Sequence, residues 1–293
     1  MLSLRLPSPA LVKDLAKLHT NKYRTTNILV EGVRSIVDIT TTYTYPTLHP
    51  STLIAYTDLL DNDLSKVIGP ETTVYELERG DRKSDQISKK LSDTATPAGA
   101  FAVYPLPSTR PLSLMPTDSS SSSSSPFFLI CDGVADPGNL GTLTRSYLAA
   151  GLTGGLLMLP NSIDPFNSKV VRASTGIVGF GVSVKRVSGV DQLIADLDAL
   201  FSGKWRLGVA TMDDDAAKTL SMPYYAAELK TMQGLVLGNE ANGVSGEVLD
   251  RLRSGDDRFV PLHVPMKNGV ESLNVGVVGS LMMFERLKPL TLV

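Results

Sequence analysis

The sequence predicts an α/β protein in which a C-terminal domain with a parallel sheet follows a small α/β substrate-binding domain. Strand-like apolar runs alternate with helical patterns along the chain, which is typical of α/β folds. In the second half the strands are nearly continuous in apolar residues, as expected when helices cover both faces of a parallel sheet. A serine tract within residues 117–128 interrupts the alternation once and reads as a flexible linker, since it cannot bury enough apolar surface to fold.

The linker, taken as residues 108–125, separates a first domain of residues 1–107 from a second domain of residues 126–293. The expected strands of the first domain are 27–32, 52–60 and 99–106, and its expected helices are 11–23, 33–39 and 84–93. The basic start of the chain resembles a transit peptide. Because the helical spacing of 11–23 leads directly into a strand, we expect the first helix of the folded protein there.

The second domain alternates more regularly. Its expected strands are 126–134, 154–160, 181–187, 206–212, 234–240 and 259–266, and its expected helices are 138–151, 167–179, 191–203 and 273–284. The last of these helices has almost no polar face, so we expect it to be deeply buried. Two glycines inside it, Gly276 and Gly279, indicate that another backbone passes close to this helix.

Composition and charge exclude several kinds of protein. Apolar residues make up 42% and charged residues 20%, as in a soluble globular protein with a core. The formal net charge of -2 gives no overall basic field, so RNA or DNA would have to bind to local patches. The single cysteine, Cys131, excludes a disulfide framework, and with three scattered histidines we expect no metal site. No apolar run has the length of a membrane span.

Polar residues gather in three loops that follow predicted strands: 132–142, 237–245 and 265–274. Ligands bind beyond the carboxyl ends of the strands in such sheets, so we expect the three loops to converge on one site. Asn139 lies between two glycines, with Arg145 further along the helix. This pattern fits a phosphate cradle or a capped turn with a surface arginine. Glu240 follows a core strand and either orients an arginine or belongs to an Asn-Gly turn.

Two segments carry basic residues where RNA phosphates could bind. Lys169 and Arg172 are one turn apart on a predicted helix. Lys22 and Arg24 precede the first predicted strand. A solvated charged surface is at least as common an explanation for each pair, so the residues alone leave both interpretations open.

Taken in order, the three loop segments resemble the motifs of the SpoU (TrmH-type) branch of the SPOUT RNA methyltransferases. The corresponding segments are 136–151, 235–245 and 264–285, with 164–176 resembling the family's sequence between the first two motifs. The N-terminal part is similar to the ribosomal-protein-like RNA-binding domain often attached to these enzymes. The resemblance covers nearly the whole chain outside the serine linker.

The resemblance implies a deep trefoil knot in the C-terminal chain, with S-adenosylmethionine bound by the knotted loops. The positions that match the family's cofactor contacts are Gly238, Val264 and Leu273, with Thr211, Pro265 and Met266 close by. The resemblance also implies a homodimer in which the active site is completed across the interface. Ala241 and Asn242 stand where the family usually has one or two glycines.

The implied reaction is methyl transfer to a ribose 2′-hydroxyl of RNA, with ribosomal RNA favoured and transfer RNA as the other candidate. Arg145 matches the family's catalytic arginine. Because a guanidinium is hard to deprotonate, we expect it to hold the phosphate and the hydroxyl in line. Asn139 would brace the nucleotide, Glu240 would orient Asn139 or Arg145, and Ser272 and Asn274 would complete the pocket. The four basic residues named above become candidates for RNA phosphate contacts.

Two other functions compete with methyl transfer. A catalytically inactive RNA-binding or ribosome-assembly protein would keep the fold, but all five candidate catalytic side chains are present, which argues against decay. An oxidoreductase would need a glycine fingerprint followed by an acidic ribose ligand, and the sequence has neither. We expect a cytoplasmic location, with the mitochondrion or plastid as alternatives, because the family-like region starts near residue 8.

Overall fold

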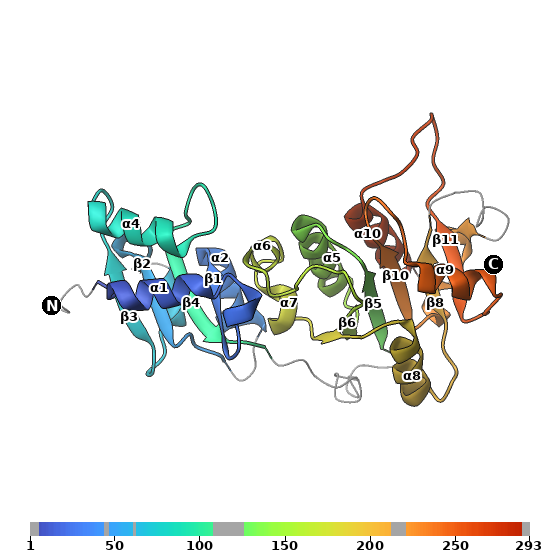
Figure 1. The fold of residues 1–293 in the computed structure, drawn as a ribbon, viewed down its shortest axis with the longest axis horizontal. Coiled ribbons are helices and arrows are strands. Elements are labelled where there is room, and N and C mark those ends of the chain that lie inside the picture. Colours follow the sequence, from blue (N-terminus) through green and yellow to red (C-terminus); the bar gives the residue numbers. More distant parts are fainter. Residues whose placement is uncertain (1–5, 44–46, 61–62, 108–125, 212–220, 289–293) are drawn as a thin grey trace. The chain divides into compact units, whose positions relative to one another are not determined.

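A computed structural model of the chain describes residues 6–43, 47–60, 63–107, 126–211 and 221–288 (Figure 1). The chain divides into two compact units. Unit 1 comprises Met1–Ser108 with Asp164–Gly181, and unit 2 comprises Thr109–Ile163 with Val182–Val293. The expected linker, 108–125, lies outside the described residues.

Unit 1 is built on a four-stranded sheet in the order β1-β4-β2-β3. Its strands are β1 (Asn27–Glu31), β2 (Thr52–Tyr56), β3 (Thr73–Leu77) and β4 (Ala100–Pro105). β4 runs antiparallel to β1 and β2, whereas β2 and β3 are parallel. The sheet is therefore mixed, and β3 forms one of its edges.

Helices cover both faces of this sheet. α1 (Pro9–Lys17) and α4 (Arg82–Leu91) bury apolar side chains against Phe101 and Val103 on one face. α2 (Val33–Asp38) lies on the other, where Tyr104 donates to the carbonyl of Ile36 at 3.0 Å. The shorter elements are a 3-10 turn (Asn21–Tyr23), a π-helical turn (Ile39–Tyr43), α3 (Thr57–Leu60) and a second 3-10 turn (Asp63–Val67).

The segment Asp164–Gly181 packs with unit 1, although the sequence places it in the second domain. Arg24, only 6% exposed, forms an ion pair with Asp164. Arg172 forms a second ion pair with Asp93 at 2.9 Å. These contacts join residues far apart in the chain, so no local pattern reveals them. They hold Asp164–Gly181 against the rest of unit 1.

In unit 1 one strand is missing from the prediction, and the predicted elements 52–60 and 167–179 differ in detail from the structure. β3 is missing from the prediction because most of its side chains are only half buried and show no clear alternation. The expected strand 52–60 ends at Tyr56, after which α3 begins. The expected helix 167–179 is two short helices, α6 (Ser168–Ala173) and α7 (Ile177–Phe180). Thr175 and Gly176, both with a positive φ, separate them; Gly179 inside α7 also has a positive φ, so α7 is not a regular α-helix.

Unit 2 contains a seven-stranded parallel sheet in the order β7-β6-β5-β10-β8-β11-β9, which confirms the predicted fold class. Its strands are β5 (Phe127–Asp132), β6 (Gly154–Met158), β7 (Val184–Arg186), β8 (Leu207–Ala210), β9 (Met222–Pro223), β10 (Gly234–Gly238) and β11 (Phe259–His263). α5 (Pro137–Ala149) and α10 (Val275–Glu285) lie together on one face, and α8 (Val190–Phe201) and α9 (Gly246–Arg253) cover the other (Figure 1).

α10 departs from the prediction that it is deeply buried. It buries Met282 and Met283, but Val277, Leu281 and Phe284 remain 45%, 38% and 45% exposed. Side chains, not a passing backbone, explain its glycines. A Cβ on Gly279 would lie 2.4 Å from Leu143 of α5, and a Cβ on Gly276 would lie 3.4 Å from Thr142 of the same helix. The two glycines therefore allow α10 to pack closely against α5.

Three remaining findings bear on function. Cys131 is buried in β5, and burial raises the pKa of its thiol to about 12. Within the described part of the chain, no group of three or more His, Cys, Asp or Glu side chains is arranged to hold a metal ion. None of the described helices is both long enough and apolar enough to cross a membrane.

Candidate active site

The predicted convergence of three loops is visible in a chain of side-chain hydrogen bonds at the carboxyl edge of the unit 2 sheet. The Nδ2 group of Asn274, at the start of α10, donates to Oδ1 of Asn139 in α5 at 2.8 Å. The Nδ2 group of Asn139 then donates to Oε1 of Glu240, just beyond β10, at 2.9 Å. One residue from each of the three predicted loops thus takes part in a single network.

Glu240 is the acceptor at the end of this network. Besides Asn139, the backbone N–H groups of Ala135 and Asp136 donate to its two oxygens at 3.2 and 3.1 Å. Partial burial acts to raise the pKa of Glu240, but these hydrogen bonds stabilise the carboxylate and hold its pKa below the ordinary value. Glu240 is therefore ionised at neutral pH and fixes the loop that precedes α5.

The loop after β10 is held by Asn239, which sequence reasoning missed. Its Nδ2 group donates to the carbonyl of Gly133 at 2.9 Å, and its Oδ1 accepts from the N–H groups of Ala241 and Asn242, both at 3.0 Å. An Asn whose side chain binds the backbone two and three residues on makes the turn that positions Glu240. The signal available in the sequence was an Asn directly after a buried strand and before an acidic residue.

Gly238, a predicted cofactor contact, is where two backbone segments come very close. A Cβ at this position would lie 2.3 Å from the carbonyl carbon of Gly243, a distance that no side chain tolerates. Asn239 and Gly243 also form an isolated antiparallel bridge. The close backbone approach expected at the glycines of α10 therefore occurs here, at the end of β10.

The start of α5 is fixed by its own cap. Asp136 accepts from the N–H of Asn139 at 2.8 Å, and Pro137 occupies the first turn, where its missing N–H costs nothing. This cap holds Asn139, which is 8% exposed, in the network. The cap and the Glu240 contacts on the same loop reinforce each other.

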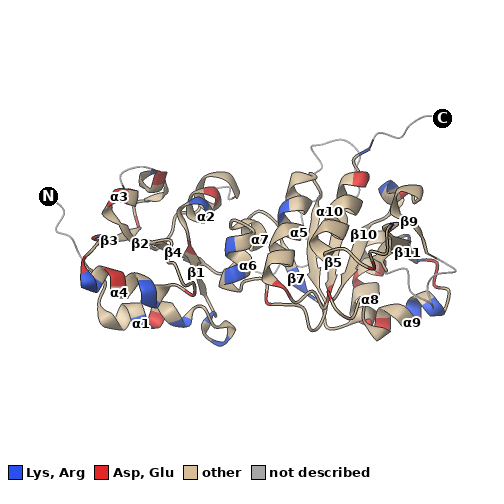
Figure 2. Cartoon of the chain, turned by 90° about the horizontal axis from the view of Figure 1, so that it is seen from above, with Lys and Arg blue, Asp and Glu red and all other residues tan. Residues whose placement is uncertain are grey.

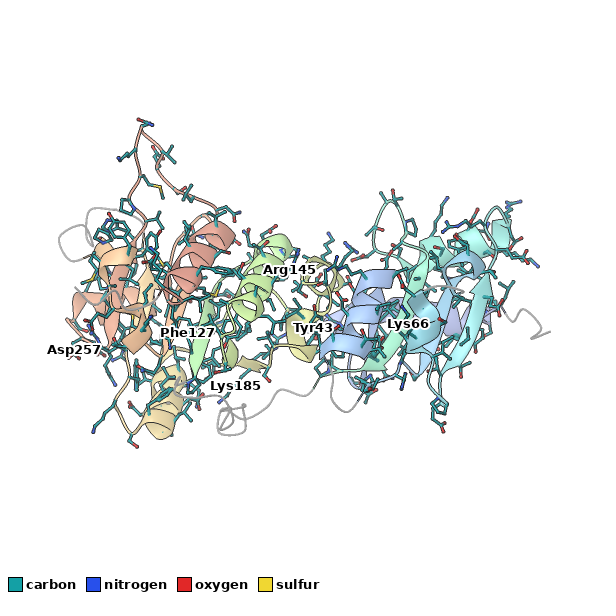
Figure 3. All side chains as sticks on the ribbon, turned by 180° about the vertical axis from the view of Figure 1, so that it is seen from behind. Tyr43, Lys66, Phe127, Arg145, Lys185 and Asp257 are labelled. Atoms are coloured by element: carbon teal, nitrogen blue, oxygen red, sulfur yellow. The ribbon has the colours of Figure 1, made fainter. Side chains whose placement is uncertain are left out.

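Arg145 lies on α5, about 9 Å further along the helix axis than Asn139 at 1.5 Å per residue. Figure 3 labels Arg145 on this helix. Its side chain is exposed, and among the described residues it has neither a hydrogen bond nor an ion pair. Of the two neighbours that Glu240 was expected to orient, it therefore holds Asn139, whose amide donates to it at 2.9 Å. Arg145 presents its guanidinium to solvent.

Asn274 caps α10 and also joins it to α5. Its Oδ1 accepts from the N–H groups of Gly276 and Val277 at 2.9 and 3.3 Å, which satisfies two donors of the first helical turn. One turn and a half further on, Ser280 and Ser146 of α5 lie within hydrogen-bonding distance, 2.7 Å between their hydroxyl oxygens. Asn274 is therefore held by the first turn of α10 and by Asn139 of α5.

The loop between β11 and α10, residues 264–274, extends away from the sheet (Figure 1). It contains Pro265, Ser272 and Leu273, all exposed, and Val264 and Met266, which are half buried. Ser272 has no hydrogen-bond partner among the described residues. The structure thus does not place Ser272 and Leu273 against Asn139 and Glu240, although Asn274 at the end of the same loop is in contact.

Three of the predicted cofactor positions lie at the carboxyl ends of neighbouring strands. Gly238 ends β10, Thr211 follows β8, and Val264 follows β11, and β8 pairs with both of the other strands. The N–H of Thr211 donates to the carbonyl of Leu262 at 2.9 Å and so extends that pairing. Backbone polar groups beside apolar side chains match the chemistry of an adenine ring, so these positions fit the predicted cofactor.

The predicted RNA contacts fall into two groups. Lys22 and Lys169 are exposed. Arg24 is not available to RNA, because it is buried and paired with Asp164, and this corrects the expectation from sequence. Arg172 is 35% exposed and engaged with Asp93, so a phosphate would have to compete with that carboxylate.

Comparison with known proteins identifies the family. Residues 126–284, more than half of the chain, match the SpoU rRNA Methylase family. The chain belongs to this family. It is accordingly an S-adenosylmethionine-dependent RNA methyltransferase, and the family match spans every residue of the three-loop network.

Relatives of this SpoU-family chain include RlmP of Bacillus subtilis, a 23S rRNA (guanosine(2553)-2′-O)-methyltransferase, 28% identical over 93% of this chain and 94% of that protein. RlmB of Xanthomonas axonopodis, a 23S rRNA (guanosine-2′-O-)-methyltransferase, is 34% identical over 55% of this chain and 57% of that protein. The mitochondrial rRNA methyltransferase 3A of Danio rerio is 29% identical over 67% of this chain and 51% of that protein. The chain thus spans nearly all of RlmP and about half of the other two.

Solved structures share the fold over almost the whole chain. The SpoU methyltransferase AviRb of Streptomyces viridochromogenes, solved with AdoMet, is 19% identical with a TM-score of 0.71, covering 95% of this chain and 97% of that one. An AdoMet-bound rRNA methyltransferase of Sinorhizobium meliloti is 22% identical with a TM-score of 0.70 and covers 96% of each chain. At these identities the likeness establishes the fold.

Proposed function

We propose that this SpoU-family enzyme transfers a methyl group from S-adenosylmethionine to a ribose 2′-hydroxyl of ribosomal RNA. The observation that carries the proposal is the network in which Asn274, Asn139 and Glu240 join the three motifs. RlmP supports the choice of reaction and substrate, because its name gives 2′-O-methylation of 23S rRNA and the match spans 94% of that protein.

Gly238, Thr211 and Val264 would hold the cofactor at the ends of β10, β8 and β11, with Pro265, Met266 and Leu273 contributing from the following loop. When bound, S-adenosylmethionine supplies an electrophilic methyl group. For the loop residues to take part, loop 264–274 has to fold over the strand ends. The trefoil knot that the family resemblance implies would hold the loop there, and it stays a prediction.

The catalytic roles follow from what each side chain is free to do. A ribose hydroxyl is a poor nucleophile, so its proton must leave as the methyl group arrives. Arg145, exposed and unpaired among the described residues, would bind the neighbouring phosphate and hold the hydroxyl in line. Asn139 would brace the nucleotide, and Glu240, whose oxygens already accept four hydrogen bonds, would orient Asn139 and not remove the proton. Ser272 and Asn274 would complete the pocket.

A homodimer joined through α10 is part of the proposal. Val277, Leu281 and Phe284 form an exposed apolar stripe along this helix, and an isolated domain seldom exposes such a surface. Arg145 lies on the adjoining helix α5 and has no hydrogen bond or ion pair within the described part of its own chain. A second copy bound to this stripe would supply the surface that completes the site.

The substrate and the place of action are proposed at a finer level than the family. We infer that Lys22 and Lys169 contact RNA phosphates, since both are exposed. Ribosomal RNA is the favoured substrate and transfer RNA the second candidate. We infer a cytoplasmic site of action, with the mitochondrion or plastid as alternatives, one of which the mitochondrial relative in Danio rerio illustrates.

The test uses purified protein, methyl-labelled S-adenosylmethionine and total RNA separated into ribosomal and transfer fractions. Label in alkali-resistant dinucleotides identifies 2′-O-methylation, because the methyl group blocks cleavage of the adjacent phosphodiester. We expect label in ribosomal RNA with the wild type and with Arg253→Ala, an exposed arginine on α9, and none with Arg145→Ala. Full activity of Arg145→Ala would refute the catalytic assignment. No label and no cofactor binding by the wild type would favour an inactive RNA-binding protein.

A further inference from the structure

The exposed face of α4 in unit 1 carries a concentration of cations that the active site does not use. Four of its ten residues are basic, namely Arg82, Lys83, Lys89 and Lys90, and all four are exposed. Figure 2 shows them as basic segments at both ends of α4. The single acidic residue of this helix, Asp85, accepts from the hydroxyl of Tyr56 at 2.8 Å and so is held toward the sheet. The outer face is therefore positive in a chain whose net charge is -2.

The orientation of this face is fixed by what α4 buries. Ser84, Ser88 and Leu91 recur at helical spacing and are buried against the unit 1 sheet. Asp81 caps the helix by accepting from the N–H of Ser84 at 2.8 Å, which sets the rotation of the first turn. At 100° per residue the basic positions lie on the side of the helix opposite the buried ones and therefore point outward, in two pairs about 10 Å apart along the helix axis.

Ion pairing does not account for these cations, and helix stability does not account for Arg82 and Lys83. Six other Lys and Arg residues of unit 1, namely Lys17, Arg24, Arg34, Lys66, Arg79 and Arg172, form ion pairs with carboxylates. The four on α4 form none among the described residues. Lys89 and Lys90 suit the C-terminal turn, where the helix dipole is negative, but Arg82 and Lys83 lie in the first turn, where the dipole opposes positive charge. An external anion would remove this conflict.

We propose that the outer face of α4 binds the phosphate backbone of the substrate RNA, an inference that rests on the proposed function. Two pairs of flexible cations with no aromatic side chain among them suit phosphates and not bases. This surface would therefore hold RNA without reading its sequence, and it adds positive charge that Lys22 and Lys169 alone do not provide.

The test measures how RNA binding depends on salt. The variant Arg82→Gln/Lys83→Gln/Lys89→Gln/Lys90→Gln is compared with the wild type, using a fluorescein-labelled single-stranded 30-nucleotide RNA of mixed sequence in 50 to 200 mM KCl. Each phosphate contact contributes about -0.7 to the slope of log K against log salt on single strands. Neutralising four contacts should flatten the slope by about 3. Between 50 and 200 mM KCl the α4 variant should therefore lose roughly 50-fold less affinity for RNA than the wild type loses.

The matched control is Lys17→Gln/Arg34→Gln/Lys66→Gln/Arg253→Gln, which removes four exposed cations that form short-range ion pairs on helices. It changes the net charge equally and should leave the slope within about 1 of the wild type. Circular dichroism and S-adenosylmethionine binding check that both variants are folded.

The outcomes separate this inference from the proposed function. If the wild type methylates ribosomal RNA but the α4 variant keeps the wild-type slope, the inference is wrong and the function stands. If the α4 variant loses the slope and the wild type methylates nothing, the RNA surface is supported and the proposed reaction is not. Equal flattening by the α4 variant and the control would show a response to net charge alone and would overturn the inference.

Discussion

Replacing Asn139 with Asp tests the network at its centre. Asn139 now donates to Glu240 at 2.9 Å and accepts from Asn274 at 2.8 Å. Aspartate has nearly the same shape and keeps the bond from Asn274. It replaces the amide that faces Glu240 with a carboxylate oxygen, so a favourable contact becomes a repulsive one without a change in volume.

The loss of stability follows from the 2.9 Å between the side chains of Asn139 and Glu240. Two like charges at 2.9 Å repel by about 6 kcal/mol at an effective dielectric constant of about 20. The cost cannot exceed the free energy of protonating one of the two carboxyl groups. At pH 7 this is about 4 kcal/mol, because each pH unit above an ordinary pKa of about 4 costs about 1.36 kcal/mol. Glu240 is largely exposed, and solvent screening reduces the repulsion further. We expect the variant to be less stable than the wild type by about 2–3 kcal/mol at neutral pH.

The sign of the pH dependence is fixed by linkage. In the variant the shared proton raises the pKa of the pair above its unfolded value, so stability falls as the pH rises from about 4 through that raised pKa. In the wild type the pKa of Glu240 is lowered, so its contribution is present above about pH 4 and is lost only as the pH falls through the folded pKa. The difference between the two proteins therefore grows from acid to neutral pH.

Urea unfolding measures this difference. Trp205 is the only tryptophan and is buried in unit 2, so its fluorescence reports on the unit that contains the network. Asn139→Asp, Asn139→Ala and the wild type are compared at pH 5 and pH 7.5. The deficit of Asn139→Asp should be about 1–2 kcal/mol larger at pH 7.5, whereas that of Asn139→Ala should hardly change. Equal deficits at both pH values for Asn139→Asp would refute the proposed contact with Glu240.

Three further predictions concern other parts of the fold. Gly238→Ala should abolish cofactor binding and destabilise unit 2 by about 1–3 kcal/mol, because its Cβ would lie 2.3 Å from Gly243. Calorimetric titration with S-adenosylmethionine measures the loss of binding. The control is Gly246→Ala, where a Cβ meets nothing within 4 Å. Arg24→Leu should cost about 3–5 kcal/mol in urea unfolding, because it removes the buried cation that pairs with Asp164, and a smaller loss than for Lys22→Leu would contradict the ion pair. Burial raises the pKa of the Cys131 thiol to about 12, so iodoacetamide should label it only in urea, and rapid labelling of the folded protein in mass spectra would contradict that burial.

The amino-acid sequence is sufficient to predict the class of fold and the centre of the site. Near-continuous apolar strands followed by helices predict a parallel sheet, and the carboxyl ends of such strands lie at one edge. Asn139, Glu240 and Asn274 can therefore be grouped from their positions along the chain. Each is close in sequence to a strand end or a helix start, where local rules fix the backbone.

The sequence is not sufficient where a contact depends on distant residues. Arg24 and Asp164 are 140 positions apart, so a basic residue before a strand looks the same whether it faces RNA or a distant carboxylate. The expected burial of α10 fails for a different reason. A helix that is apolar all round fits both a deeply buried helix and one whose outer face is covered by another chain, and periodicity does not distinguish them.

Packing of α10 against α5 connects these observations to catalysis. Gly276 and Gly279 let the two helices approach closely, and this approach brings Asn274 to Asn139. A larger residue at Gly279 would separate the helices and break the network from a distance. Arg145 on α5 is exposed, and α10 carries the exposed apolar stripe Val277, Leu281 and Phe284. In the proposed function, the network within one chain orients the nucleotide, and a second copy bound to the apolar stripe of α10 completes the site; loss of activity on replacing Gly279 with a larger residue would test this link.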